Sequence, residues 1–193
     1  MEENRTEYEL SADTPGKEQV TAPEYIPSGK YDGILYSVYK NQTYYEMMRI
    51  SCYAIAALTA YALFMTLVGY FEAGRYLDMI NVALITGVPF VTVSALRHFI
   101  NAPRPYELFE FYEKKPKKKF GRSFPSRHVF SIFVIGTVII PENVFLGIGL
   151  LVLGVILAVL RVLMGLHFIR DVAAGGAIGV VSGVVGILIT SFI

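Results

Sequence analysis

Two histidines and several arginines lie at the edges of long apolar segments, where charged side chains are costly and are functional candidates. Asp171 follows His167 by four residues, so both side chains share a helix face if a helix begins near His167. A carboxylate bonded to one imidazole nitrogen leaves the other nitrogen as a nucleophile. His128 begins another apolar segment and could protonate a leaving group as a general acid.

Basic side chains near these histidines predict that the ligand is an anion. They are Arg97, Arg104, Arg127 and Arg161. Guanidinium groups gathered in a low dielectric repel one another unless an anion lies between them, and their planar donors match the oxygens of phosphate. Ser126 is a candidate N-cap, and the free backbone N–H groups of a helix start would extend this anion site. The set suffices for phosphoryl transfer without a metal or a cofactor.

The composition indicates that membrane helices position these residues. The chain has 193 residues, of which 54% are hydrophobic, and the net charge is only +1. Its apolar residues form blocks that approach or exceed the roughly 18 to 20 residues needed to cross a bilayer. These blocks cover residues 50–71, 77–100, 125–140, 144–163 and 168–193. We therefore predict an all-α polytopic membrane bundle with about five transmembrane helices, which excludes an ordinary soluble domain.

The N-terminal part of the chain differs in composition from this bundle. Residues 1–30 are polar and lack apolar periodicity, which predicts a disordered tail before a catalytic transmembrane domain at 31–193. Residues 31–49 mix tyrosines, aliphatic side chains and charges. That mixture favours a helix lying at the membrane interface, and a structured loop is the alternative.

The distribution of positive charge predicts the orientation in the membrane. With five spans, the N-terminal region, the loop at 101–123 and the turn at 161–171 lie on one side. That side holds every Lys and Arg except Arg75, so the positive-inside rule places it in the cytoplasm. The basic run at 113–122 either steers anionic lipid head groups toward the site or is a solvated loop.

Three motifs occur in order along the chain. They are Arg97-x6-Arg104-Pro105, Pro125-Ser126-Arg127-His128 and Leu160-Arg161-x5-His167-x3-Asp171. This pattern resembles the type-2 phosphatidic acid phosphatase (PAP2) superfamily, whose motifs are K-x6-R-P, P-S-G-H and S-R-x5-H-x3-D. The chain departs from these motifs at three positions, with arginine at 97 for lysine, arginine at 127 for glycine and leucine at 160 for serine.

The resemblance implies a role for each motif residue. His167 would attack phosphorus and form a phosphohistidine, Asp171 would orient it, and His128 would protonate the departing hydroxyl. The phosphate oxygens would be held by Arg97, Arg104, Ser126 and Arg161. Arg127 is either a further phosphate ligand or a surface cation. None of the three departures removes a catalytic atom, but they put the choice of substrate in doubt.

The implied function is metal-independent hydrolysis of a membrane lipid phosphate or diphosphate. Candidate substrates are phosphatidic acid, phosphatidylglycerophosphate and polyprenyl diphosphates, with membrane lipids and not nucleic acid as partners. A vanadium haloperoxidase-like enzyme is an alternative, which the lack of room for a soluble helical domain disfavours. The other is a non-catalytic protein that binds or transports lipid phosphate. Intact His128, His167 and Asp171 speak against it, because binding alone needs no nucleophile. The oligomeric state stays open.

Overall fold

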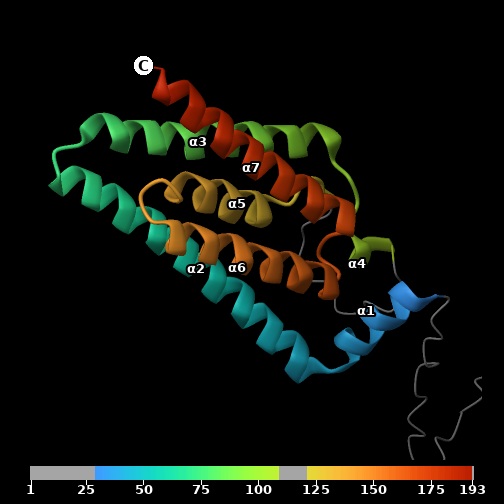
Figure 1. Cartoon of the computed structure of the whole chain (residues 1–193). Coiled ribbons are helices and arrows are strands. Elements are labelled where there is room, and N and C mark those ends of the chain that lie inside the picture. Colours follow the sequence, from blue (N-terminus) through green and yellow to red (C-terminus); the bar gives the residue numbers. More distant parts are fainter. Residues whose placement is uncertain (1–28, 109–120, 193) are drawn as a thin grey trace, which may run out of the picture.

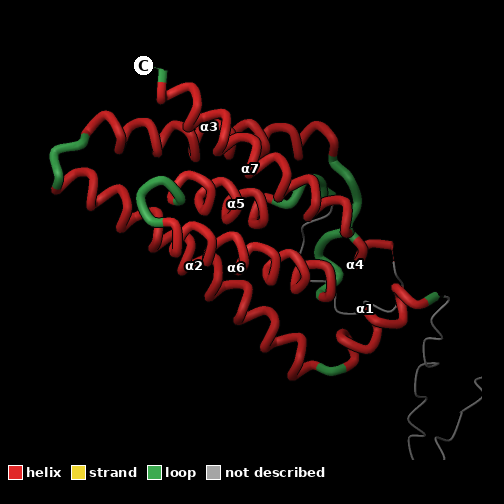
Figure 2. The backbone as a smooth tube through the Cα atoms, in the orientation of Figure 1, coloured by secondary structure: helices red, strands yellow, loops and turns green. Residues whose placement is uncertain are grey.

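The computed structural model describes residues 29–108 and 121–192, and all structural statements concern these residues. This part of the chain is all-helical and contains no strand (Figure 2). Its helices are α1 (Lys30–Lys40), α2 (Gln42–Glu72), α3 (Tyr76–Ile100), α4 (Pro105–Leu108), α5 (Arg127–Ile139), α6 (Val144–Leu163) and α7 (Ile169–Ser191). The prediction of an all-α membrane bundle is confirmed. Nearly all of the tail at 1–30 and most of the basic run at 113–122 fall outside the described residues.

Four of the described helices, α2, α3, α6 and α7, are long and apolar enough to cross a membrane. The remaining expected span, α5, has only 13 residues, which corresponds to about 20 Å against a hydrocarbon core of about 30 Å. Nine of those residues are buried, as expected of a helix that is apolar on all sides. Figure 1 shows α5 between α6 and α7, and it also contacts α2 and α3. The predicted span at 125–140 is thus a short central helix enclosed by the others.

A helix break at Asn41 divides the segment that was predicted to lie at the membrane interface. The Asn41 side chain accepts a hydrogen bond from the Tyr44 N–H at 3.2 Å and so caps α2. Residues 42–49 therefore belong to α2, and the separate helix is the shorter α1. Leu35 of α1 is buried against Tyr106 of α4. A helix rather than a loop therefore precedes the first span, and it packs at the end of the bundle that carries α4 (Figure 1).

Glycines on α7 let its backbone approach α5 closely. A Cβ atom at Gly175 would lie 2.6 Å from the Ser126 carbonyl oxygen, and one at Gly179 would lie 2.7 Å from the Phe130 carbonyl oxygen. Small residues permit such approaches between helices in lipid. The backbone N–H of Ser126 also donates to the carbonyl of Asp171 at 2.9 Å. This contact sets the start of α5 directly against the start of α7.

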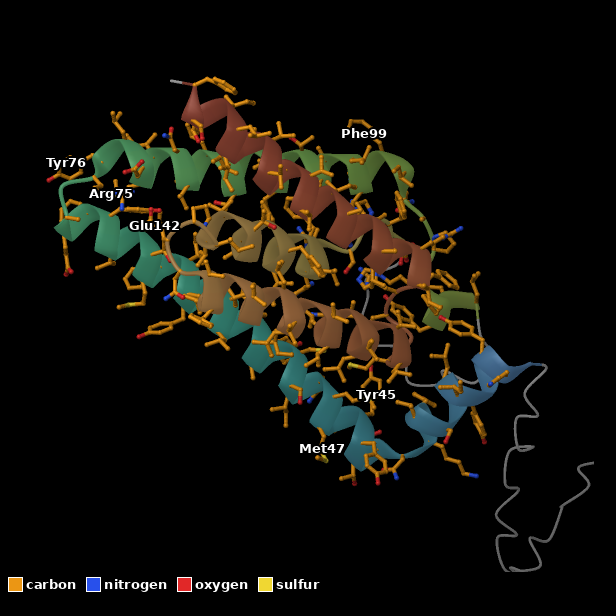
Figure 3. The ribbon with its side chains drawn as sticks, viewed as in Figure 1. Tyr45, Met47, Arg75, Tyr76, Phe99 and Glu142 are labelled. Atoms are coloured by element: carbon orange, nitrogen blue, oxygen red, sulfur yellow. The ribbon has the colours of Figure 1, made fainter. Side chains whose placement is uncertain are left out.

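An ion-pair cluster joins two turns at the opposite end of the bundle. Arg75, between α2 and α3, donates to both carboxylate oxygens of Glu142 at 2.9 and 3.0 Å and to Asp78 at 2.7 Å. Figure 3 shows the labelled side chains of Arg75 and Glu142 meeting between these turns. Because the groups are exposed, water screens the attraction. The cluster pairs the Arg75 charge with carboxylates on the side of the bundle that was predicted to carry no other Lys or Arg.

The close approach of α5 and α7 leads to a stability prediction. Gly179→Ala should force the two helices apart and destabilise the protein by about 1–3 kcal/mol, as overpacking does in well-packed cores. Gly69→Ala is the matched control, because no heavy atom of the described residues lies within 4 Å of a Cβ at that position. Thermal unfolding in detergent should show a lower Tm for Gly179→Ala only. Equal Tm values would contradict the proposed close packing.

Candidate active site

The predicted site residues come together at one end of the bundle, where several helices begin or end. Arg97 lies in the last turn of α3 and Arg161 in that of α6, while Asp171 lies in the first turn of α7. Ser126 precedes α5, and His167 lies in the turn between α6 and α7. Figure 1 shows these helix termini gathered near α4. Antiparallel connections therefore bring distant motifs to one place.

His167 and Asp171 are enclosed, with exposed fractions of 2% and 0%. The His167 Nδ1 atom lies 3.7 Å from Asp171 Oδ2, which is too long for the predicted hydrogen bond. Ser123 lies between them, with its Oγ 2.5 Å from Asp171 Oδ2 and 3.3 Å from His167 Nδ1. Asp171 Oδ2 also accepts the N–H of Phe168 at 3.0 Å, which holds the carboxylate at the start of α7. A serine hydroxyl thus bridges the two predicted partners.

This bridge determines which imidazole nitrogen is available for attack. The Ser123 hydroxyl donates its only proton to Asp171, so in its contact with His167 it must be the acceptor. The Nδ1 atom of His167 therefore carries a proton and donates it to Ser123 Oγ. The proton-free Nε2 is then the nitrogen with a lone pair available for attack. Burial lowers the pKa of His167 below its ordinary value, and the nearby Asp171 carboxylate acts in the opposite direction. A lowered pKa keeps the imidazole in the neutral form at pH 7, and only this form can attack.

Sequence reasoning missed Ser123. Its only signal was a serine two residues before Pro125, in the segment that carries the second motif. The separation of 44 residues from His167 gave no reason to pair them. The contact depends on the loop before α5 passing beside the turn before α7.

Arg97 is buried and holds that loop in place. Its Nη1 donates to the carbonyl of Pro125 and reaches the carbonyl of Ser123 at 3.5 Å, and its Nη2 donates to the carbonyl of Arg122. These donors are therefore engaged with backbone oxygens. The positive charge of Arg97 still lowers the pKa of His167. Arg97 thus links the end of α3 to the segment that carries Ser123.

Arg104 binds the other end of the same loop. Its Nε donates to the carbonyl of Gly121 at 3.1 Å, and the N–H of Gly121 donates to Glu107 at 2.7 Å. The positive charge of Arg104 repels the charges of Arg97 and Arg161 and disfavours the protonated form of His167. The three arginines therefore form one positive cluster around the buried histidine.

Two polar atoms of the predicted phosphate site are buried without a partner. Within the described ranges, neither the Nε of Arg161 nor the Oγ of Ser126 has a hydrogen-bond partner. Their residues are only 9% and 0% exposed. A buried donor without an acceptor is costly, and more so when it is charged. A bound oxyanion would satisfy both groups.

His128 and Arg127 lie at the edge of this enclosed cluster, where they line a groove of about 470 Å³ together with Phe90 and residues of α2 and α6. His128 is exposed toward this groove, yet the charges of Arg161 and His167 act on it. The Arg127 guanidinium lies 5.9 Å from the centre of the Phe90 ring. His128 therefore stands between the arginine cluster and the groove.

Metal ligands do not accompany this arrangement in the described part of the chain. No group of three or more His, Cys, Asp or Glu side chains there could hold a metal ion. The arrangement contains an imidazole with a free ring nitrogen, a carboxylate beside it, a second histidine and a cluster of cations. That chemistry fits phosphoryl transfer.

Comparisons with known proteins identify the family of this chain. Residues 50–192 match the model of the PAP2 superfamily. The structure of LpxE from Aquifex aeolicus is similar, with a TM-score of 0.57 and 26% identity over 74% of this chain and 93% of that chain. A PAP2-type phosphatidylglycerolphosphate phosphatase from Bacillus subtilis has a TM-score of 0.54 and 20% identity, over 84% of this chain and 93% of its own. No curated protein sequence matches.

The family match extends well beyond the three motifs and covers α2 from residue 50 onward, the other three spanning helices and the central helix. Both similar structures are covered almost completely, so the likeness concerns the whole fold and not a local fragment. The chain belongs to the PAP2 superfamily, and it is an integral membrane enzyme, a lipid phosphatase.

Proposed function

We propose that this enzyme hydrolyses a lipid phosphate or diphosphate through a phosphohistidine at His167, without a metal or a cofactor. The observation that carries the proposal is the enclosed His167–Ser123–Asp171 arrangement. Beside it lie buried arginine and serine donors for which the described residues offer no partner. A purely structural histidine would not need an orienting carboxylate and a surrounding positive cluster. A phosphate group would neutralise part of this positive charge and accept hydrogen bonds from the unpaired donors.

In the first step, Nε2 of His167 attacks phosphorus in line with the leaving oxygen. The nitrogen–phosphorus bond forms as the bond from phosphorus to the lipid oxygen breaks, and His128 gives a proton to that oxygen. Negative charge on the remaining phosphate oxygens is stabilised by Arg104, Arg161 and Ser126. These donors lie in a site that largely excludes water, which strengthens each interaction.

In the second step, water replaces the nitrogen at phosphorus. His128, now neutral, takes a proton from the attacking water, and inorganic phosphate leaves as His167 is released. The Asp171 carboxylate stabilises positive charge that develops on the His167 ring. Arg97 stays a proposed phosphate-binding residue whose charge acts on the site while its donors hold the loop.

The substrates we propose are phosphatidic acid, phosphatidylglycerophosphate and polyprenyl diphosphates. The groove beside His128 lies between spanning helices and is lined mainly by apolar side chains, which suits a hydrocarbon chain attached to the leaving oxygen. The similar Bacillus subtilis enzyme is a phosphatidylglycerolphosphate phosphatase. The structural similarity to that enzyme shows a shared fold, and at 20% identity its substrate is for the present chain only a proposal.

We also propose that the site faces the cytoplasm. The site end of the bundle carries nearly all the positive charge of the described residues, whereas Arg75 at the other end is paired with Glu142 and Asp78. The positive-inside rule then assigns the site to the cytoplasmic face. Substrates would in that case come from the inner leaflet.

Replacing the proposed nucleophile should abolish catalysis. His167→Ala should lower phosphate release from the three lipid classes about 10³-fold or more, because no other group can form the intermediate. Release is measured in detergent with EDTA present. His98→Ala is the matched control, since His98 is exposed and belongs to none of the motifs. Equal release by wild type and His167→Ala, or no release by wild type from any lipid, would refute the proposal.

Removing the bridging hydroxyl should slow the reaction without weakening substrate binding. Ser123→Ala leaves His167 and Asp171 3.7 Å apart with no connecting group, so kcat should fall about 10- to 100-fold through misplacement of the ring. The KM should change by less than about twofold, because Ser123 does not contact the phosphate. Ser51→Ala, which removes an exposed hydroxyl on α2, is the control. A rise in KM with unchanged kcat would show that Ser123 binds substrate instead.

The orientation can be tested with single cysteines at the two ends of the bundle. Ser37 on α1 and Glu72 at the end of α2 are exposed, while the native Cys52 is buried. A membrane-impermeant maleimide applied to intact cells should label Glu72→Cys but not Ser37→Cys. Permeabilised cells should label both. The opposite pattern would place the site outside and overturn the cytoplasmic proposal.

A further inference from the structure

Arg127 carries a charge in an unfavourable electrostatic environment, and neither step of the proposed reaction uses it. The superfamily motif P-S-G-H has glycine at this position, where only backbone is present. In this chain a guanidinium group stands in the first turn of α5, at the positive end of the helix dipole. Arg97 is close enough for the two charges to repel each other. No ion pair between Arg127 and a carboxylate is found within the described residues. A bound anion would offset the unfavourable charge of this partly exposed cation.

The neighbours of Arg127 show where that anion would lie. Arg127 is stacked near Phe90 and lines the groove together with His128, the residue that follows it in the chain. The other groove residues are mainly apolar and include Ala56, Leu63, Ile132, Ile135 and Leu157. Among the described groove residues, Arg127 and His128 are the charged or titratable side chains, and they are adjacent at the start of α5. A ligand that fills the groove would carry its charge beside Arg127 and place hydrocarbon against the apolar residues.

The order of groups along the substrate follows from this geometry. The reacting phosphate lies in the enclosed arginine cluster, and the leaving oxygen lies at His128. The next part of the molecule must pass Arg127 before the hydrocarbon chain enters the groove. A phosphate monoester of a simple lipid has no charge at that point, whereas a lipid with a second phosphate has an anion there.

We propose that Arg127 binds a second phosphate of the substrate, which lies between the reacting phosphate and the hydrocarbon chain. This inference rests on the proposed function and narrows its substrate class. In a diphosphate lipid, the bond from the terminal phosphorus to the bridging oxygen breaks, and that oxygen takes its proton from His128. The leaving group is then a lipid monophosphate, whose negative charge Arg127 stabilises. In phosphatidylglycerophosphate the leaving oxygen belongs to glycerol, and the phosphodiester is the second anion.

Two matched pairs of substrates test the proposal and separate these two sources. One pair is farnesyl diphosphate and farnesyl monophosphate, and the other is phosphatidylglycerophosphate and phosphatidic acid. For each pair the measured quantity is the ratio of kcat/KM for the two-phosphate lipid to that for the one-phosphate lipid. Arg127→Ala should lower the ratio about 10- to 100-fold in at least one pair, as the loss of a charged hydrogen bond does. The affected pair identifies the second phosphate.

Two further variants distinguish a specific contact from general charge. Arg127→Lys should recover part of the ratio, because lysine keeps the charge but lacks the two-pronged donor geometry. Arg49→Ala is the matched control, since Arg49 is an exposed arginine of α2 that pairs with Glu46 at 2.5 Å. Its ratios should equal those of the wild type. Equal loss on both members of each pair, or no change in either ratio, would overturn the inference.

A binding measurement keeps the inference testable independently of turnover. In the His167→Ala background, the Kd for the affected two-phosphate lipid should rise about tenfold or more on Arg127→Ala. If neither Kd rises, Arg127 does not bind a second phosphate. The proposed function fails by a different result, which is unchanged phosphate release in His167→Ala. The two failures are therefore distinguishable.

Discussion

The structure depends on keeping positive charge buried at one end of an apolar bundle. Arg97 and Arg161 are both at most 9% exposed, and desolvated charges are expensive without compensating partners. The protein meets this cost for Arg97 with the carbonyl oxygens of the loop before α5. For Arg161, the described residues leave the Nε donor without an acceptor. Arg161 therefore has a donor free for an anionic ligand, and a phosphate group would supply the missing acceptor.

Close backbone packing makes the charge cluster possible. The glycine face of α7 brings the start of α5 against the start of α7, and the Ser126 N–H then reaches the Asp171 carbonyl. With larger side chains on α7, the two helix starts would separate, and Ser123 would no longer lie between His167 and Asp171. His167 is therefore positioned by helix packing as much as by its own hydrogen bonds. Rigid helix termini also suit a reaction in which small displacements are costly.

The two histidines differ because their surroundings differ. His167 is enclosed, and its Nδ1 is committed to Ser123 and Asp171, so it presents a single nitrogen to phosphorus. His128 opens to the groove, where a leaving group with a hydrocarbon chain would depart. The enclosed residue is suited to form a covalent intermediate, and the open one is suited to exchange protons. Arg127, which differs from the glycine of the family motif, lies beside His128 at this groove.

Much of the fold was predictable from local patterns. Apolar blocks of sufficient length determined the four spanning helices, because an isolated chain segment can cross lipid only as a helix. The spacing of His167 and Asp171 and the three ordered motifs identified the family. The family and the membrane-bound lipid phosphatase activity are confirmed, whereas the roles of individual site residues stay predictions.

Only the tertiary structure decided the remaining features, since they depend on contacts between distant segments. Sequence alone determined that α5 is apolar, but not that it is a short central helix enclosed by its neighbours. It determined that Ser123 and Arg97 are present. It did not determine that a hydroxyl bridges His167 and Asp171, or that backbone carbonyls accept hydrogen bonds from the Arg97 guanidinium. Hydropathy and spacing report on interactions within a segment. Which donor meets which acceptor across the bundle is set by how the helices pack.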